Sequence, residues 1–358
     1  MAEEHRATAD GEHRAHWTRE GFAGQHTTLL RPHATPEFVA VEGLHAPHRL
    51  AVAALRPPDR DDPAALPLVF MAARSGLQLS VSARQAPMPF VVVNVEADEV
   101  HFVQAGALRF ETDHGALTAE AGELVCVPRA VQYRMVPERT PTLSVTVEVP
   151  EALAFAPVAA ARLALERPAL DGVVATDDAA AVDGVAAADG ETVVLVKAFD
   201  GVTRYRRPHD PLAAVVLREG TPPVWKFHLG RNLAACGGPP EPFLLTASRD
   251  ALFFNLSARP GRRRPPIHHN ADYDELIYYV GGPGAYGRVT APGTLTWVPK
   301  GIPHQGPSED VPEGYVAWMV ESRSTLRLTP AGLAAAELME LDGYGRHPAA
   351  APALAARP

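Results

Sequence analysis

The sequence predicts an all-β protein built from two antiparallel barrel domains of jelly-roll type, with a few short helices. From Glu37 onward, apolar segments of strand length alternate with Gly, Pro and Asp turn signals. The strand-rich halves also match each other at a separation of about 170 to 176 residues. A repeat of this length indicates a duplicated domain rather than a solenoid, whose units are far shorter. At 358 residues the chain is long enough for two such domains.

The first strand-rich region extends to Val149 and follows a polar segment, residues 1–36, that reads as a solvated arm. Turn signals at His114-Gly115 and Ala121-Gly122 mark hairpins. We therefore expect residues 1–150 to hold an arm and one barrel. Its predicted strands are LPLVFMA, FVVVNV, EVHFVQ, ALRFET, ALTAEA, ELVCVP and TLSVTVEV.

The composition changes near residue 150, where we place a domain boundary. Residues 151–220 contain an Ala/Asp/Gly-rich connector and the strands that lead into the second barrel. Residues 221–358 are expected to form that barrel, with a short C-terminal helix and a disordered tail. The helix is predicted to begin at Thr329-Pro330 and to cover AGLAAAELMEL.

Composition excludes several functional classes. The formal net charge is -9, and no Lys/Arg-rich run suggests a nucleic-acid partner. No apolar run approaches the roughly 20 residues that span a bilayer, and the acidic N-terminus is unlike a signal peptide. Cys126 and Cys236 alone imply no disulfide framework. We expect a cytoplasmic protein with neither nucleic-acid nor membrane partners.

The repeat indicates which barrel carries chemistry. The segment Asn94–Glu99 matches Asn270–Glu275, and the segment from Gly122 to Tyr133 matches that from Gly293 to His304. Where the second copy has His268 and His269, the first has valines, and where the second has His304, the first has Tyr133. In this alignment Glu99 lacks an imidazole partner. We therefore expect a metal-free first barrel and a working second barrel.

Three residues of the second barrel are the predicted metal ligands: His269, Glu275 and His304. His269 and Glu275 are six residues apart and share a strand face if the strand is regular between them. His268 is the alternative ligand; otherwise its side chain is expected to point toward the substrate or the surroundings of the metal. His304 ends the pattern G-x5-P-x-G-x2-H, which resembles the second signature motif of cupins. Two imidazoles, one carboxylate and open positions suit Fe(II), with Mn(II), Zn(II) or Ni(II) as alternatives.

The block RRRPPIHHNADYDELIYY, followed by PHQGP, resembles homogentisate 1,2-dioxygenase, a family of two-barrel (bicupin) iron enzymes that open an aromatic ring. GFAGQHTTLLRPHATP, TVVLVKAFDGVTRYRRPHDPL and PPVWKFHLG are similar to other segments of that family. The resemblance implies Fe(II) on His269, Glu275 and His304, an aromatic substrate with O2, and a homo-oligomer.

The chain departs from that family at two places. GRNLAACGGPPEP has no His where the family has its presumed base, and VVLREG replaces a Trp-Asp-Gly element. We therefore expect a hydroxylated aromatic substrate, hydroquinone-like or aminophenol-like, other than homogentisate itself.

Further residues are candidates for the reaction. The predicted catalytic residues are His228, Tyr279 and Gln305. His228 would replace the missing base, and Gln305 would donate a hydrogen bond to bound oxygen. Tyr279 would line the pocket, although it could equally fill the barrel core. The predicted substrate-binding residues are Lys226, Arg231, Tyr286 and His268. Two alternatives stay open, namely a metal-dependent bicupin isomerase or decarboxylase and a non-catalytic bicupin that binds a small ligand.

Overall fold

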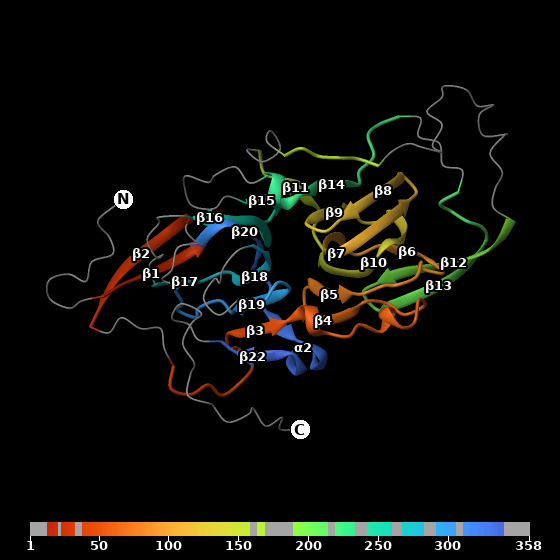
Figure 1. The fold of residues 1–358 in the computed structure, drawn as a ribbon. Coiled ribbons are helices and arrows are strands. Elements are labelled where there is room, and N and C mark those ends of the chain that lie inside the picture. Colours follow the sequence, from red (N-terminus) through yellow and green to blue (C-terminus); the bar gives the residue numbers. More distant parts are fainter. Residues whose placement is uncertain are drawn as a thin grey trace. The chain divides into compact units, whose positions relative to one another are not determined.

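The computed structural model describes residues 13–20, 23–32, 38–157, 163–168, 189–213, 219–232, 242–259, 267–282, 291–305 and 311–339. Within these residues the regular structure is almost entirely β-strand, so the all-β prediction is confirmed (Figure 1). The described helices are short: 3-10 turns at Val52–Ala54, Pro58–Arg60 and Leu229–Asn232, and the α-helix α2 (Pro330–Ala334). None of the helices described has the length and apolarity to cross a membrane.

The chain forms two compact units. One is continuous in sequence, Leu55–Asn232, and is called the continuous unit; the other combines Met1–Ala54 with Leu233–Pro358 and is called the split unit. These bounds differ from the expected 1–150, 151–220 and 221–358. The first 54 residues group with the C-terminal barrel, and residues 221–232 group with the N-terminal one.

The continuous unit is dominated by two long antiparallel strands, β7 (Asp98–Thr112) and β10 (Gln132–Val149), which pair along most of their length. β10 also lies between β6 and β5 in a sheet of order β13-β12-β6-β10-β5-β4, while β7 pairs with β8 and β9, and β9 with β14. The remaining bounds are β4 (Leu68–Ala73), β5 (Gln78–Ser82), β6 (Val91–Asn94), β8 (Gly115–Glu120), β9 (Glu123–Val127), β11 (Leu153–Phe155), β12 (Asp189–Ala198), β13 (Gly201–His209) and β14 (Trp225–His228).

The split unit contains a sheet of order β15-β16-β20-β18-β19-β3-β22 and a smaller sheet of order β17-β1-β2. The bounds are β1 (His13–Glu20), β2 (Ala23–Arg31), β3 (His48–Ala51), β15 (Pro242–Thr246), β16 (Ala251–Arg259), β17 (Ile267–Asn270), β18 (Asp274–Gly281), β19 (Thr294–Val298), β20 (Val311–Ser322), β21 (Leu326–Leu328) and β22 (Ala336–Leu338).

A hairpin is added to each unit in the same way. In the split unit the hairpin β1–β2 pairs in parallel with β17, with His16 opposite His268 (Figure 1). In the continuous unit the hairpin β12–β13 pairs in parallel with β6, with Leu195 opposite Val92. Each barrel therefore incorporates a hairpin from the other half of the chain, which explains why one unit is split in sequence. The described part of residues 1–36 is therefore a β-hairpin rather than a disordered arm, although β2 is largely exposed to solvent.

The C-terminal helix is shorter than predicted. Thr329 caps it, its hydroxyl accepting a hydrogen bond from the Gly332 N–H, as the Thr-Pro signal indicates. The helix ends at Ala334, and Ala336–Leu338 instead pair with β3 as strand β22. Strand pairing here overrides the helix propensity of an Ala-rich segment.

In the continuous unit, apolar core side chains occupy the positions at which the split unit has polar side chains. Val92 and Tyr133, opposite each other on β6 and β10, belong to an apolar cluster with Phe90, Phe110 and Leu108. In the split unit the apolar clusters are centred on Tyr279 and Tyr315, and on Phe254 and Tyr273. The matching His268 and His304 lie outside these clusters.

Candidate metal centre

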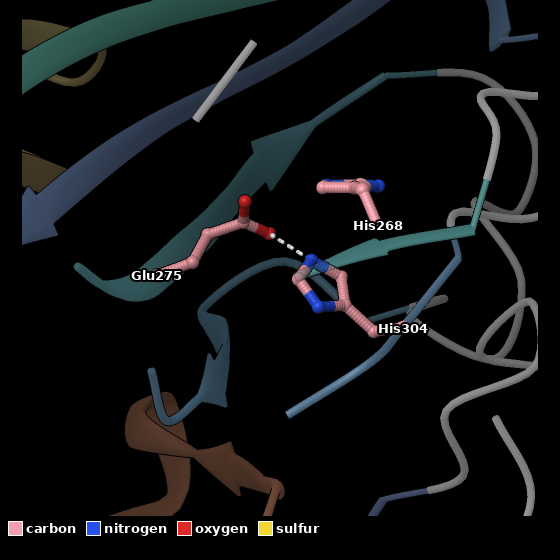
Figure 2. Close-up of side chains that lie close together, drawn as sticks. All are labelled: His268, Glu275 and His304. Carbon is pink, nitrogen blue, oxygen red and sulfur yellow. Dashed lines mark ion pairs between the residues drawn. The ribbon is translucent and has the colours of Figure 1, made fainter. Parts of the chain in front are cut away.

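His268, Glu275 and His304 converge in the split unit (Figure 2). Each offers one ligand atom, and these atoms all lie within 4.8 Å of one another. All three residues are buried, with exposed fractions of 4%, 8% and 2%. Among the residues that the structure describes, this is the one group of His, Cys, Asp and Glu side chains close enough to hold a metal ion.

The backbone explains why these side chains meet. His268 and His304 form an isolated antiparallel bridge, with mutual N–H to carbonyl hydrogen bonds of 2.9 and 2.8 Å. Cross-strand partners in such a bridge present their side chains on the same face. Gly301, at φ +78°, makes the turn that returns the chain toward β17, and its N–H donates to the Asn270 carbonyl at 2.7 Å.

The structure brings His268, rather than the predicted His269, together with Glu275 and His304. The parity argument assumed a regular strand from His269 to Glu275. β17 instead ends at Asn270, and residues 271–273 bend before β18 begins at Asp274. His268 and Asn270 are buried on β17, whereas His269 is only half-buried on its other face, opposite Trp17 of β1.

The proton positions at His304 follow from its contacts. Nδ1 lies 3.0 Å from the Ile302 carbonyl, which can only accept, so Nδ1 carries the proton and donates. The lone pair of a neutral Nε2 then faces Glu275 Oε1 at 3.7 Å, a distance too long for a hydrogen bond. Nε2 is buried and has no hydrogen-bond partner among the described residues.

Electrostatics couple the carboxylate to the imidazoles. Burial alone raises the pKa of Glu275, but His304 and, less strongly, His268 lower it below its ordinary value. Burial opposes the charged form of His304, yet Glu275 and the Ile302 carbonyl raise the pKa of this imidazole. The carboxylate therefore stays ionised and attracts a positive charge, either a proton or a cation, to this position.

The donor set fits a divalent transition metal. Ligand atoms that are each about 2.1 Å from one ion can be separated by up to about 4.2 Å, and Nε2 and Oε1 are 3.7 Å apart. A cation between them would also satisfy the buried Nε2. The backbone carbonyl on Nδ1 is the kind of outer contact that fixes the tautomer of metal-binding histidines.

Asp274 stabilises the loop that carries His304. Its buried carboxylate accepts hydrogen bonds from the N–H groups of Lys300 and Leu326, at 3.0 and 2.9 Å, and from Trp297 Nε1 at 3.3 Å. Burial nevertheless raises the pKa of Asp274. Asp98 is the counterpart in the continuous unit and accepts from the N–H groups of Arg129 and Leu153.

Three predicted substrate or catalytic residues lie in the continuous unit. Lys226 and His228 are on β14, which pairs with β9, and Arg231 is in the 3-10 helix that follows. The Lys226 ammonium forms an ion pair with Glu123, in which Nζ lies 3.0 Å from Oε2. The prediction that this segment belongs to the C-terminal barrel was wrong, because Trp225 and Phe227 are buried as β14 extends the sheet of the continuous unit.

The other predicted residues stay in the split unit or fall outside the described chain. Tyr279 lies on the same face of β18 as Glu275, but it stacks on Tyr315 and donates to the Gly282 carbonyl at 3.1 Å. Gln305 follows His304 and is half-buried. Tyr286 lies outside the described residues. Catalytic roles for Tyr279 and Gln305 stay predictions.

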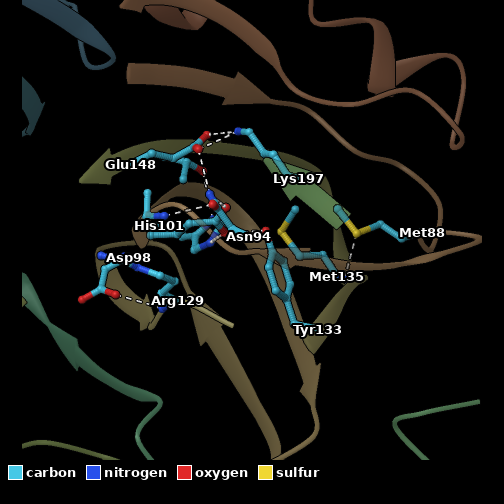
Figure 3. A network of polar contacts seen from close by, with 12 residues as sticks. Met88, Asn94, Asp98, His101, Arg129, Tyr133, Met135, Glu148 and Lys197 are labelled. Carbon is cyan, nitrogen blue, oxygen red and sulfur yellow. Dashed lines mark hydrogen bonds and ion pairs between the residues drawn. The ribbon is translucent and has the colours of Figure 1, made fainter. Parts of the chain in front are cut away.

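The matching site of the continuous unit is closed by hydrogen bonds (Figure 3). Tyr133 donates to Glu99 Oε2 at 2.6 Å, and His101 Nε2 lies 3.1 Å from the same oxygen. Asn94 Nδ2 donates to both Glu99 and Glu148, and Lys197 Nζ lies 2.5 Å from Glu148 Oε1.

The expectation that Glu99 lacks an imidazole partner was wrong. His101, two residues along β7, shares its face, a signal that strand alternation could have supplied.

No family model matches the chain. It is similar to a cupin 2 conserved barrel domain protein from Leptotrichia buccalis, at 10% identity and a TM-score of 0.41, over 80% of this chain and 100% of that one. It is also similar to oxalate decarboxylase from Bacillus subtilis. One such structure, concerned with its Mn(II) centres, gives 10% identity, a TM-score of 0.41, and coverage of 86% of this chain and 87% of that one. Another, a deletion mutant, has 9% identity.

Proposed function

We propose that the chain is an Fe(II)-dependent dioxygenase that cleaves the ring of a hydroxylated aromatic compound. The observation that carries the proposal is the buried group of His268, Glu275 and His304, whose donor atoms lie within 4.8 Å of one another. Two imidazoles and one carboxylate leave coordination positions open, as in the facial ligand set of non-haem Fe(II) oxygenases. The sequence resemblance to ring-opening iron enzymes supports the substrate class.

The residues of the site set its charge. When bound, Fe(II) supplies Lewis acidity that lowers the pKa of a coordinated hydroxyl group and the electron needed to activate O2. Glu275 brings one negative charge, and His268 and His304, as ligands, are neutral. Fe(II) together with these three ligands therefore would keep a net positive charge, which favours coordination of an anionic oxygen such as a phenolate.

The test is Fe(II) reconstitution of protein purified anaerobically, followed by metal analysis and O2-uptake measurements. Hydroquinone, catechol, gentisate-like and aminophenol compounds are the substrates to screen. We expect about one Fe(II) per chain and substrate-dependent O2 uptake that His304→Ala abolishes. Metal binding with turnover but without O2 uptake would instead indicate a decarboxylase or isomerase. Absence of metal would indicate a non-catalytic binding protein.

A further inference from the structure

Asn270 lies on the same face of β17 as His268 and is held there from both sides. The two residues are separated by one position on a regular strand, and Asn270 is only 2% exposed. Its carbonyl accepts from the Gly301 N–H at 2.7 Å, and the next N–H, that of Ala271, donates to the Thr18 carbonyl at 2.8 Å. The backbone therefore fixes the carboxamide on the face that carries the metal ligand.

Only one of the two polar atoms of the Asn270 side chain has a hydrogen-bond partner among the described residues. Oδ1 accepts a buried hydrogen bond from Thr18 Oγ1 at 3.1 Å. Nδ2 is buried and has no hydrogen-bond partner in the part of the chain that the structure describes. Buried polar groups are almost always hydrogen-bonded, because leaving one unpaired is costly. An unpaired amide donor beside a ligand set therefore points to an acceptor that arrives with the bound molecule.

The continuous unit shows what an amide at this position reaches. Asn94 ends β6 as Asn270 ends β17, and Lys197 is opposite Asn94 as Thr18 is opposite Asn270. Nδ2 of Asn94 donates to Glu99 Oε1 and Glu148 Oε2, both at 2.9 Å. The amide at this position is thus directed toward negatively charged oxygens of the barrel interior.

We propose that Asn270 is a further ligand-binding residue of the metal centre, whose Nδ2 donates a hydrogen bond to an anionic molecule bound at the open side of the metal. Thr18 is the positioning residue, because its hydroxyl on Oδ1 orients the amide with Nδ2 toward that molecule. The N-terminal hairpin is in this way part of the site. This inference rests on the proposed metal site, but it does not depend on the reaction catalysed there.

The test uses azide as the anionic probe on the full-length protein loaded with Co(II), whose visible absorption reports both metal and anion binding. Chelator competition gives the Co(II) affinity of each variant. We expect Asn270→Ala to keep Co(II) affinity within about threefold and to bind azide about 10- to 100-fold more weakly. Asn270→Asp should bind azide more weakly still, because it adds a negative charge.

Thr18 supplies a variant that leaves Asn270 in place. Thr18→Val should weaken azide binding about 3- to 10-fold at unchanged Co(II) affinity, and Thr18→Ser should restore it. Thr27→Val, the same substitution at an exposed position of the same hairpin, is the matched control and should have no effect.

The outcomes separate this inference from the proposed metal site. Equal azide affinity for wild type, Asn270→Ala and Thr18→Val at equal Co(II) occupancy overturns the inference and leaves the metal site intact. A fall of about 100-fold in the Co(II) affinity of Asn270→Ala also overturns it, since the carboxamide would then be a metal ligand itself. A wild-type protein that binds no Co(II) overturns both.

Discussion

The Tyr133 hydroxyl donates a 2.6 Å hydrogen bond to the buried carboxylate of Glu99 in the continuous unit. Tyr133 is opposite Val92, as His304 is opposite His268 in the split unit. The duplicated barrels therefore stabilise a buried carboxylate at the same place by different means: a phenol, an imidazole and an amide in one unit, and two imidazoles in the other.

Removing the Tyr133 hydroxyl should destabilise the continuous unit. We expect Tyr133→Phe to lower the free energy of unfolding by about 1–3 kcal/mol, because Glu99 loses a buried donor while the ring still packs. Urea denaturation followed by circular dichroism measures the change. Tyr205→Phe, the same substitution at a half-exposed tyrosine, is the control and should stay within about 0.5 kcal/mol of wild type.

Glu99 should make stability depend on pH in the acid range. Burial opposes its ionised form, but His101, Tyr133 and Asn94 outweigh burial and lower the pKa of Glu99 from 4.5 to about 2. A group with a lower pKa in the folded state stabilises fully above its unfolded pKa, and this stabilisation is lost as the pH falls through the folded pKa. We expect a loss on the order of 3 kcal/mol between about pH 5 and pH 2.

The measurement is the free energy of unfolding against pH for wild type and Glu99→Gln. The variant should be less stable at pH 7 and should show a shallower decline in acid. Parallel curves for the two proteins would contradict the assignment to Glu99.

Lys197 should be needed to compensate the negative charge of Glu148. The ammonium lies 2.5 and 2.6 Å from the two carboxylate oxygens, and the carboxylate is nearly buried. Removing one partner of such a pair leaves an uncompensated charge, so Lys197→Met should cost about 3 kcal/mol. The double variant Lys197→Met/Glu148→Gln should recover much of that loss. A double variant as unstable as the single one would show that the lysine acts through packing.

The sequence repeat predicted the architecture because barrel strands alternate and turn in a recognisable pattern. The motif around Gly301 and His304 likewise predicted one residue of the candidate metal centre, since the turn and this side chain are local in sequence. The added hairpins were missed because their partner strands lie in the other half of the chain. One sequence signal was available: Arg31-Pro32-His33 recurs as Arg207-Pro208-His209, at the spacing that relates His268 to Val92.

The choice between His268 and His269 shows where periodicity stops being informative. Counting six residues to Glu275 crosses the bend at residues 271–273, and a bend resets which face a side chain occupies. Asn270 aligns with Asn94 in the repeat. Counting two residues back from Asn270 stays within β17 and gives His268. The alignment was reliable where it stayed inside one strand.

The adjacent histidines make a direct test of the ligand set. His268→Ala should lose metal binding, because one of three ligands is removed, and its Co(II) affinity should fall by a factor of about 100 or more. His269→Ala, on the opposite face of the same strand, should keep Co(II) affinity within a few-fold of wild type.

Binding is measured by chelator competition, and stability in parallel by thermal unfolding with and without Co(II). Metal at 100 times its Kd should stabilise wild type and His269→Ala by about 2.7 kcal/mol, and His268→Ala hardly at all. A reversed order of the two variants would return the ligand role to His269 and remove the reason for placing Asn270 beside the metal.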